Sequence, residues 1–303
     1  MARGMALAIP LLAIWLGGAL VGCRTLSRRA PCDDNIIAAR ELTQKGLEAL
    51  QRGRWLEAEI KLVRAIEAWP MDPQTHQYYA EALWHRGARE RAIAEMEQAV
   101  RLSGADATRT AQLGEMHLAN GDITASLAAC DEALRADRTS GRSWKLRGDI
   151  LVRQEDLQGA LDAYHHSLSC DDAAPEIRME IAELYRHRGD PRRALSTLQR
   201  LADFYDLDEK PWRIDELEGL AYQALDRHDE AVEHFEAAAA RGEPSGALLL
   251  AMAKSQLALG HWEHARYSAE QARERQPELA AAADRVLGQM AVARSQPQAG
   301  VHR

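Results

Sequence analysis

The sequence predicts an all-α protein built as a solenoid of repeated helical pairs. One template of 34 residues recurs in seven copies that stay in phase along most of the 303-residue chain. Ala, Leu, Glu and Arg are abundant, and these residues favour helix. No long stretch alternates apolar and polar residues with the two-residue period of a strand. We therefore expect helical pairs that stack on their neighbours instead of one closed globular core.

Residues 1–22 have the composition of a secretory signal peptide. Arg3 supplies a positive start, and Met5–Leu20 is apolar and ends in small residues. An uncleaved transmembrane helix is the alternative interpretation. The apolar stretch is shorter than the roughly 20 residues that a span needs, and Pro10 interrupts it.

The four residues Leu20–Cys23 resemble the lipobox of bacterial lipoproteins. In that family a peptidase cleaves before the cysteine, and the cysteine thiol then carries diacylglycerol. The resemblance implies that Cys23 is lipidated and holds the protein on a membrane. Because Arg24 and not Asp follows Cys23, the family's sorting rule implies the outer membrane, with the protein facing the periplasm.

Residues 23–38 are predicted to form the lipidated cysteine and a tether. The stretch Arg24–Asn35 is polar and contains Pro31. Arg28 and Arg29 lie close to the membrane in sequence, where they either contact anionic head groups or remain solvated.

The repeat region has small and large residues at fixed places of the template. The units begin at Ala39, Pro73, Ala107, Gly141, Pro175, Trp212 and Gly246. The eighth and twentieth places are Gly, Ala or Ser in every unit, which lets two antiparallel helices approach closely. The fifteenth place, where the helices turn, is Gly except at Glu155 and Asp226. The twenty-fourth place is bulkier and is expected to fill the seams between pairs.

This pattern resembles the tetratricopeptide repeat in its period and in its small and large positions. The resemblance extends from residue 39 to 279 and implies a right-handed superhelix whose first helices line a concave groove for protein partners. A capping helix is expected over residues 279–294, and residues 295–303 are expected to be disordered. The step between the fifth and sixth units is longer. Its residues Leu201–Trp212 are either a packed loop, or a partner contact or slight hinge between units.

The candidate partner-binding groove centres on an acidic ninth place in four consecutive units. The predicted groove residues are Glu81, Trp84, Glu115, Lys145, Asp149, Arg153, Glu183 and Arg186. The four carboxylates would attract a Lys/Arg-rich or extended segment of a protein partner. The alternative is a solvated surface whose charge Arg142, Lys145 and Arg186 compensate.

Other function classes find little support in the sequence. It contains no GxxxxGK[ST], GxSxG or HExxH motif, so no catalytic residue, metal site or cofactor is predicted. The net charge of −8 argues against binding to nucleic acid, which requires a basic face. Cys32 and Cys170 either pair or stay free.

We therefore expect a membrane-anchored protein-interaction scaffold in a bacterial envelope assembly. The assembly belongs to the outer membrane, to pilus or secretion machinery, or to cell-wall machinery. The alternatives are a self-associating structural lipoprotein and an enzyme with no recognisable motif.

Overall fold

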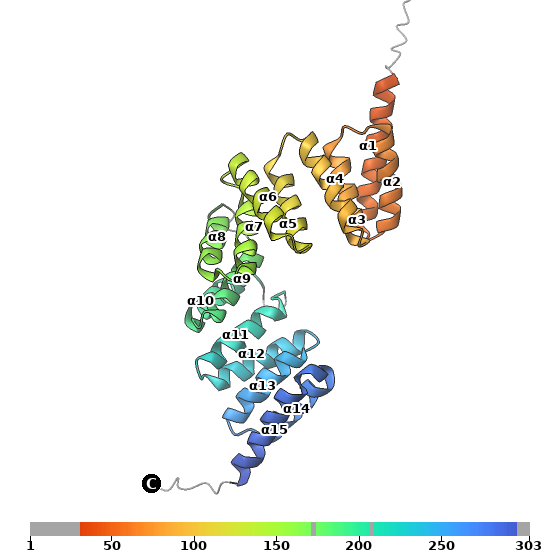
Figure 1. Cartoon of the computed structure of the whole chain (residues 1–303). Coiled ribbons are helices and arrows are strands. Elements are labelled where there is room, and N and C mark those ends of the chain that lie inside the picture. Colours follow the sequence, from red (N-terminus) through yellow and green to blue (C-terminus); the bar gives the residue numbers. More distant parts are fainter. Residues whose placement is uncertain (1–30, 171–173, 207–208, 296–303) are drawn as a thin grey trace, which may run out of the picture.

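The structure is a computed structural model that describes residues 31–170, 174–206 and 209–295. Within these ranges every regular element is helical (Figure 1). The helices are α1 (Pro31–Gln51), α2 (Trp55–Ala68), α3 (Pro73–His85), α4 (Arg89–Leu102), α5 (Ala107–Ala119), α6 (Ile123–Ala136), α7 (Gly141–Arg153), α8 (Leu157–Cys170), α9 (Pro175–His187), α10 (Pro191–Ala202), α11 (Trp212–Ala224), α12 (His228–Arg241), α13 (Gly246–Ala258), α14 (Trp262–Arg275), the 3-10 helix η1 (Pro277–Leu279) and α15 (Ala280–Ser295). None of these helices is long and apolar enough to cross a membrane.

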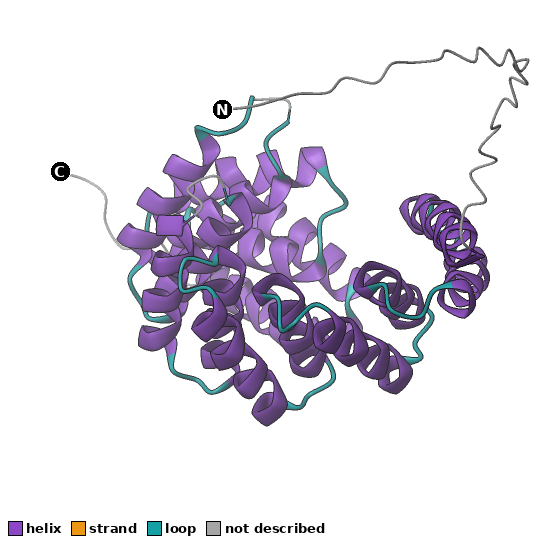
Figure 2. Cartoon of the chain, turned by 90° about the horizontal axis from the view of Figure 1, so that it is seen from above, coloured by secondary structure: helices purple, strands orange, loops and turns teal. Residues whose placement is uncertain are grey.

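The helices form consecutive pairs that stack into a curved array, so the predicted all-α solenoid is confirmed. Each odd-numbered helix from α1 to α13 packs against the even-numbered helix that follows it. First helices of neighbouring units also contact one another, as α5 does with α7 and α11 with α13. Seen from above, the array follows a curved path (Figure 2). The second to seventh units begin at the residues at which their sequence repeats begin.

The predicted tether, residues 23–38, is wrong in its second half, because α1 already begins at Pro31. Proline is favoured at the first position of a helix, where its missing N–H group has no helical partner to lose. The polarity of this stretch is compatible with a helix as well as with a tether. Residues 1–30, with the predicted signal peptide and Cys23, lie outside the described residues, as do the side chain of Cys32 and the tail 296–303. Cys170 is an exposed free thiol.

Close approach within a pair depends on glycine at the eighth place. A Cβ atom added to Gly148 would lie 2.3 Å from the ring of Tyr164, and one added to Gly219 would lie 2.6 Å from the ring of Phe235. Each ring belongs to the same unit as its glycine, occupies the twenty-fourth place of that unit and is fully buried. The ring therefore packs against the partner helix in the space that a side chain at the eighth place would occupy.

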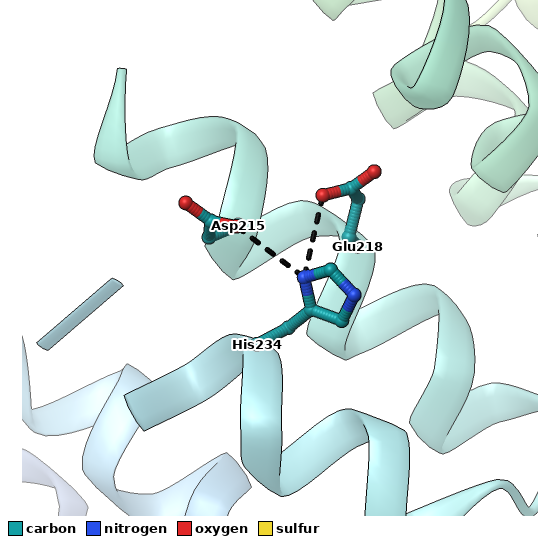
Figure 3. A group of neighbouring side chains, drawn as sticks. All are labelled: Asp215, Glu218 and His234. Carbon is teal, nitrogen blue, oxygen red and sulfur yellow. Dashed lines mark hydrogen bonds and ion pairs between the residues drawn. The ribbon is translucent and has the colours of Figure 1, made fainter. Parts of the chain in front are cut away.

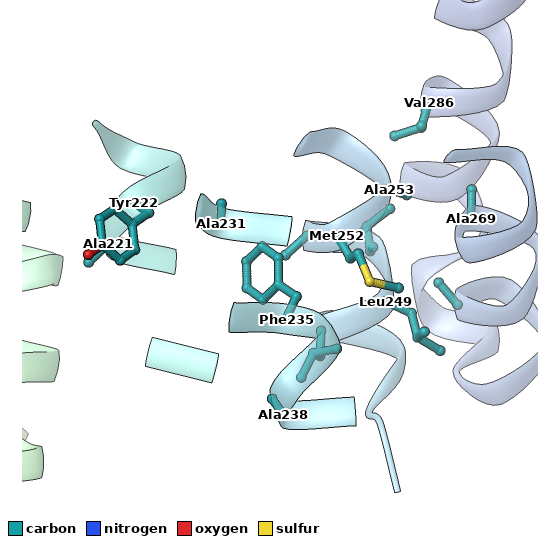
Figure 4. Close-up of a cluster of buried hydrophobic side chains, with 14 of the residues drawn as sticks. Ala221, Tyr222, Ala231, Phe235, Ala238, Leu249, Met252, Ala253, Ala269 and Val286 are labelled. Atoms are coloured by element: carbon teal, nitrogen blue, oxygen red, sulfur yellow. The ribbon is translucent and has the colours of Figure 1, made fainter. Parts of the chain in front are cut away.

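The C-terminal units share the largest buried cluster (Figure 4). Phe235 of α12 lies near its centre, beside Leu249 and Met252 of α13. Val286 of α15 packs against the same cluster. Helix α15 thus covers an apolar face that the last repeat would otherwise expose, as the end of a solenoid requires.

The turn between paired helices uses the left-handed backbone conformation even where glycine is absent. Glu155 has φ 63° and Asp226 has φ 56°, close to the 88° of Gly121. A residue with a Cβ atom is strained in this conformation, by roughly 1–2 kcal/mol. The template geometry therefore overrides the local preference of these two residues.

We predict that Glu155→Gly raises the free energy of unfolding by about 1 kcal/mol, because it removes the Cβ clash at positive φ. Gly121→Ala should lower it by about the same amount. Urea unfolding followed by circular dichroism measures both changes. Glu155→Ala is the matched control, since it removes the exposed carboxylate but keeps Cβ. An equal gain in that control would show that charge and not backbone strain is responsible.

A buried histidine ties the loop between α2 and α3 to α4. His76 Nδ1 lies 2.7 Å from Glu95 Oε2, and Nε2 lies 3.0 Å from the carbonyl oxygen of Pro70. Both partners are acceptors, so only the imidazolium form can donate to both. Burial alone would lower the pKa of His76, but the bonds to Glu95 and Pro70 and the nearby carboxylates raise it above its usual value.

The His76 contacts should stabilise the protein most when the imidazole is charged. A raised folded-state pKa contributes stability that is fully present below the unfolded pKa of about 6.5 and lost as pH rises through the folded value. His76→Gln should therefore cost about 2 kcal/mol near pH 5.5 and distinctly less near pH 9. Urea unfolding at the two pH values measures the difference. A cost that does not change with pH would contradict the assignment.

Candidate protein-binding groove

The four predicted ladder carboxylates lie on successive first helices, α3, α5, α7 and α9. Three of them are already paired within the chain. Glu115 accepts two hydrogen bonds from the guanidinium of Arg142, at 2.8 and 2.5 Å. Glu183 accepts from Arg213 at 2.6 Å. Both arginines belong to the first helix of the following unit, so these ion pairs link neighbouring units.

Asp149 is paired within its own unit. Its carboxylate accepts from Lys145 Nζ at 2.8 Å and from the Tyr164 hydroxyl at 2.7 Å. By contrast, Glu81 makes no hydrogen bond or ion pair with any described residue. Charge compensation, the alternative interpretation of the ladder, therefore describes three of its four members, with Arg213 and not the predicted Arg186 as the partner of Glu183. The groove surface is of mixed charge, and Glu81 offers its uncompensated carboxylate.

Six of the eight predicted groove residues line two adjoining hollows. The first hollow, of about 290 Å³, is bounded by α3 and α5 and is lined by Glu81, Trp84, His85, Gln112, Glu115, Met116 and Ala119. The second, of about 440 Å³, is lined by Glu115, Leu118, Ala119, Lys145, Asp149, Val152, Arg153, Tyr164 and Glu180. Glu115 and Ala119 line both, so the two hollows are neighbours along the first helices. Glu183 and Arg186 line neither hollow.

Glu180 and Arg213 contribute to this region although the sequence analysis did not select them. Burial raises the pKa of Glu180, and the carboxylates of Glu183 and Asp149 raise it further. Arg213 could have been found from its spacing. It lies 30 residues after Glu183 across the lengthened step, as Arg142 lies 27 residues after Glu115.

A second cluster of charged side chains lies at the long step between the fifth and sixth units. Figure 3 shows His234 of α12 directed toward Asp215 and Glu218 of α11, with its Nδ1 3.3 Å from an oxygen of each. Lys210, from the longer connection, places Nζ 2.8 Å from both carboxylates. Arg241 also pairs with Asp215.

This cluster, Lys210, Asp215, Glu218, His234 and Arg241, is a balanced set of ion pairs. The ligand atoms of Asp215, Glu218 and His234 lie within 4.8 Å of one another, a spacing that a metal ion could bridge. Lys210 already supplies a positive charge between the two carboxylates. Lys210 and Arg241 balance the charges of the two carboxylates, so the cluster fits a structural set of ion pairs. Through Lys210, the cluster binds the lengthened connection to α11.

The loop aromatics of the long step are partly packed. Arg178 lies over the ring of Phe204, with 4.7 Å from its guanidinium carbon to the ring centroid. Tyr205 packs against the buried cluster that α9, α10 and α11 share. Phe204 nevertheless keeps 56% of its surface exposed. The packed-loop interpretation thus holds for Tyr205 and only in part for Phe204.

Comparison with known proteins identifies the family. Profiles of the tetratricopeptide repeat match residues 43–107, 112–175 and 145–211 with one profile and 217–241 with another. These matches extend over more than half of the chain, so it belongs to the tetratricopeptide repeat family. No curated protein sequence matches it. Repeats of this family support a role as a protein-interaction scaffold.

Several solved structures share the fold at low sequence identity. PilF of Pseudomonas aeruginosa superposes with a TM-score of 0.59 at 18% identity, over 67% of this chain and 91% of PilF. A tetratricopeptide repeat protein from Parabacteroides merdae gives 0.59 at 17%, over 84% and 99%. PilW, described as a widely conserved type IV pilus biogenesis factor, gives 0.59 at 18%, over 65% and 90%. At these identities the likeness extends to the fold alone.

We predict that Lys210→Met lowers the free energy of unfolding by about 3 kcal/mol near neutral pH, because two buried carboxylates lose their shared cation. Burial would raise the pKa of Asp215, but His234, Lys210 and Arg241 hold it below its usual range. Its stabilising contribution is therefore present above the unfolded pKa and lost as pH falls through the folded one. The difference between variant and parent should shrink over that range.

Urea unfolding at several pH values measures this effect. Lys254→Met is the matched control, since Lys254 is exposed and makes no ion pair with a described residue. Equal destabilisation by both substitutions would mean that the cluster contributes nothing specific.

Proposed function

We propose that this protein is a membrane-anchored scaffold of a bacterial envelope assembly and that it holds a partner protein along the hollows of its first helices. The observation that carries the proposal is that two neighbouring hollows share Glu115 and Ala119 and follow one another along the first helices. Neighbouring hollows of this kind suit an extended segment, which can place successive side chains in successive hollows.

The chemistry of the groove indicates the kind of segment. Glu81 and Glu180 form no ion pair within the described part of the chain, although Lys145 and Arg213 lie near enough to Glu180 to act on its pKa. Lys145 and Arg153 are the basic residues of the second hollow. Trp84 adds an aromatic surface at the end nearer the first unit. A segment with Lys or Arg beside Glu81 and with apolar side chains between its charges would complement this arrangement.

Membrane attachment through lipidated Cys23 is the second part of the proposal, and it rests on the lipobox resemblance of residues 20–23. Two acyl chains or more on one cysteine are enough for stable anchoring. An outer-membrane location facing the periplasm follows from the same resemblance. Pilus assembly, the role given to PilW, is one candidate pathway beside secretion, cell-wall and outer-membrane assembly. Self-association is the competing proposal, and sedimentation at several concentrations separates the two.

The variant Glu81→Gln with Trp84→Ala should reduce partner recovery about tenfold or more, because aromatic anchors carry a large share of binding energy. Cross-linking in membranes followed by purification and mass spectrometry measures the recovery. Glu132→Gln, on the outer helix α6, is the matched control and should change nothing. Glu81 is the preferred target, because removing Glu115 or Glu183 would break an ion pair, with Arg142 or Arg213, that links neighbouring units. Undiminished recovery with a folded double variant would overturn the groove assignment.

Replacing Cys23 with Ser should move the protein from the membrane fraction to the soluble fraction, because no thiol remains for the lipid. Cell fractionation with immunoblotting detects the change, and metabolic labelling with a fatty acid detects the loss of the acyl chains. Cys170→Ser is the control. If the Cys23 variant stays in the membrane and is still labelled, lipidation at this residue is wrong.

A further inference from the structure

Exposed apolar side chains concentrate on the first unit. Among the described residues seven large apolar side chains are exposed, and four of them are Ile37, Leu56, Ile60 and Met71. Leu56 is 58% exposed and Ile60 is 47% exposed. They are four residues apart on α2 and therefore share one side of the helix.

Comparison within the chain shows that the repeat does not require apolar residues there. Leu56 and Ile60 occupy the eighteenth and twenty-second places of the template. In the other units the eighteenth place is Glu90, Thr124, Gln158, Arg192, Asp229 and Glu263, and the twenty-second is Ala94, Ala128, Asp162, Ser196, Glu233 and Tyr267. Only the first unit has large aliphatic residues at both places. We call Leu56 and Ile60 the α2 patch.

The charges around the α2 patch favour an anionic surface. The two acidic residues nearest to the α2 patch in sequence already form ion pairs with arginines. Glu57 pairs with Arg54 at 3.4 Å, and Glu59 pairs with Arg86. In contrast, Lys61 makes no ion pair with a described residue. Arg52 and Arg64, at either side in sequence, likewise make none. Cations without internal partners thus accompany the two aliphatic side chains.

We propose that the α2 patch lies on the anionic lipid surface to which the chain is anchored, an inference that rests on the proposed membrane attachment. Pro31 is eight positions after Cys23, so the chain between them spans at most about 26 Å. The start of α1 is therefore held within about 26 Å of the bilayer. The first unit follows directly, and its high effective concentration at the membrane makes a small contact sufficient. Aliphatic side chains enter the head-group region, and Lys and Arg contact anionic lipids.

A second copy of the chain is a poorer occupant. A stable protein interface buries about 800 Å² on each partner, far more than two aliphatic side chains provide. The patch also lies on a second helix, whereas the groove is built on first helices. Contact with lipid through α2 would leave the two hollows open to a protein partner and would orient the array on the membrane.

Depth-dependent fluorescence quenching in the full-length lipidated protein tests the inference. Cys32 and Cys170 are replaced with Ser, and an environment-sensitive fluorophore is attached at Ile60→Cys. The same label at Ala94→Cys, the twenty-second place of the second unit, is the matched control. The protein is reconstituted into vesicles of phosphatidylcholine and phosphatidylglycerol that contain a spin-labelled lipid.

We expect the label at residue 60 to shift to the blue and to be quenched several-fold more than the label at residue 94. Replacing phosphatidylglycerol with phosphatidylcholine should weaken this quenching. Equal quenching at the two positions would overturn the inference. So would a blue shift at residue 60 that needs no vesicles and grows with protein concentration, because that result assigns the patch to a second copy.

Flotation of the same samples separates this inference from the proposed function. Protein that floats with vesicles but shows no selective quenching at residue 60 retains its membrane anchor and refutes only the lipid contact of the α2 patch. Protein that does not float refutes the membrane attachment and this inference together. Partner recovery through the groove is measured independently of both.

Discussion

The close approach of the two helices in each unit is the constraint on which the rest of the structure depends. Where the eighth place is glycine, the bulky residue of the twenty-fourth place occupies the space of the missing side chain. Leu62 does so beside Gly46, and Tyr164 does so beside Gly148. Because this contact joins the two helices of a unit closely, each pair acts as a stiff building block. Pairs that stack side by side then bring first helices of neighbouring units, such as α5 and α7, into contact.

The same geometry determines which charges remain available for a partner. A carboxylate at the ninth place meets the second place of the next unit, so Arg142 neutralises Glu115. The corresponding residue after Glu81 is Thr108, which carries no charge. Asp149 would face Glu176, and it pairs instead with Lys145 of its own helix. The available charge in the groove is therefore a consequence of stacking and not of the total number of acidic residues.

Sequence reasoning reached the fold because the repeat encodes it locally. Small residues, turn positions and period recur often enough to determine where the first helices of the second to seventh units begin. The side-chain pairing in the groove depends on contacts between units, which a search within one template does not reveal. The ion-pair cluster at the long step also escaped notice, because Lys210 reaches Asp215 and Glu218 only when the lengthened connection folds back on α11. The early start of α1 was missed because a polar composition can accompany helix as well as linker.

The central claim is that the hollows of the first helices hold an extended protein segment while the chain is anchored at a membrane. Site-specific photo-cross-linking in intact cells tests it most directly, with a photoreactive amino acid placed at Trp84 in the groove or at Glu132 on the outer face. We predict a discrete adduct with one protein from position 84 and none from position 132. Adducts of equal strength from both positions, or none from position 84 in a folded and membrane-bound protein, would contradict the account.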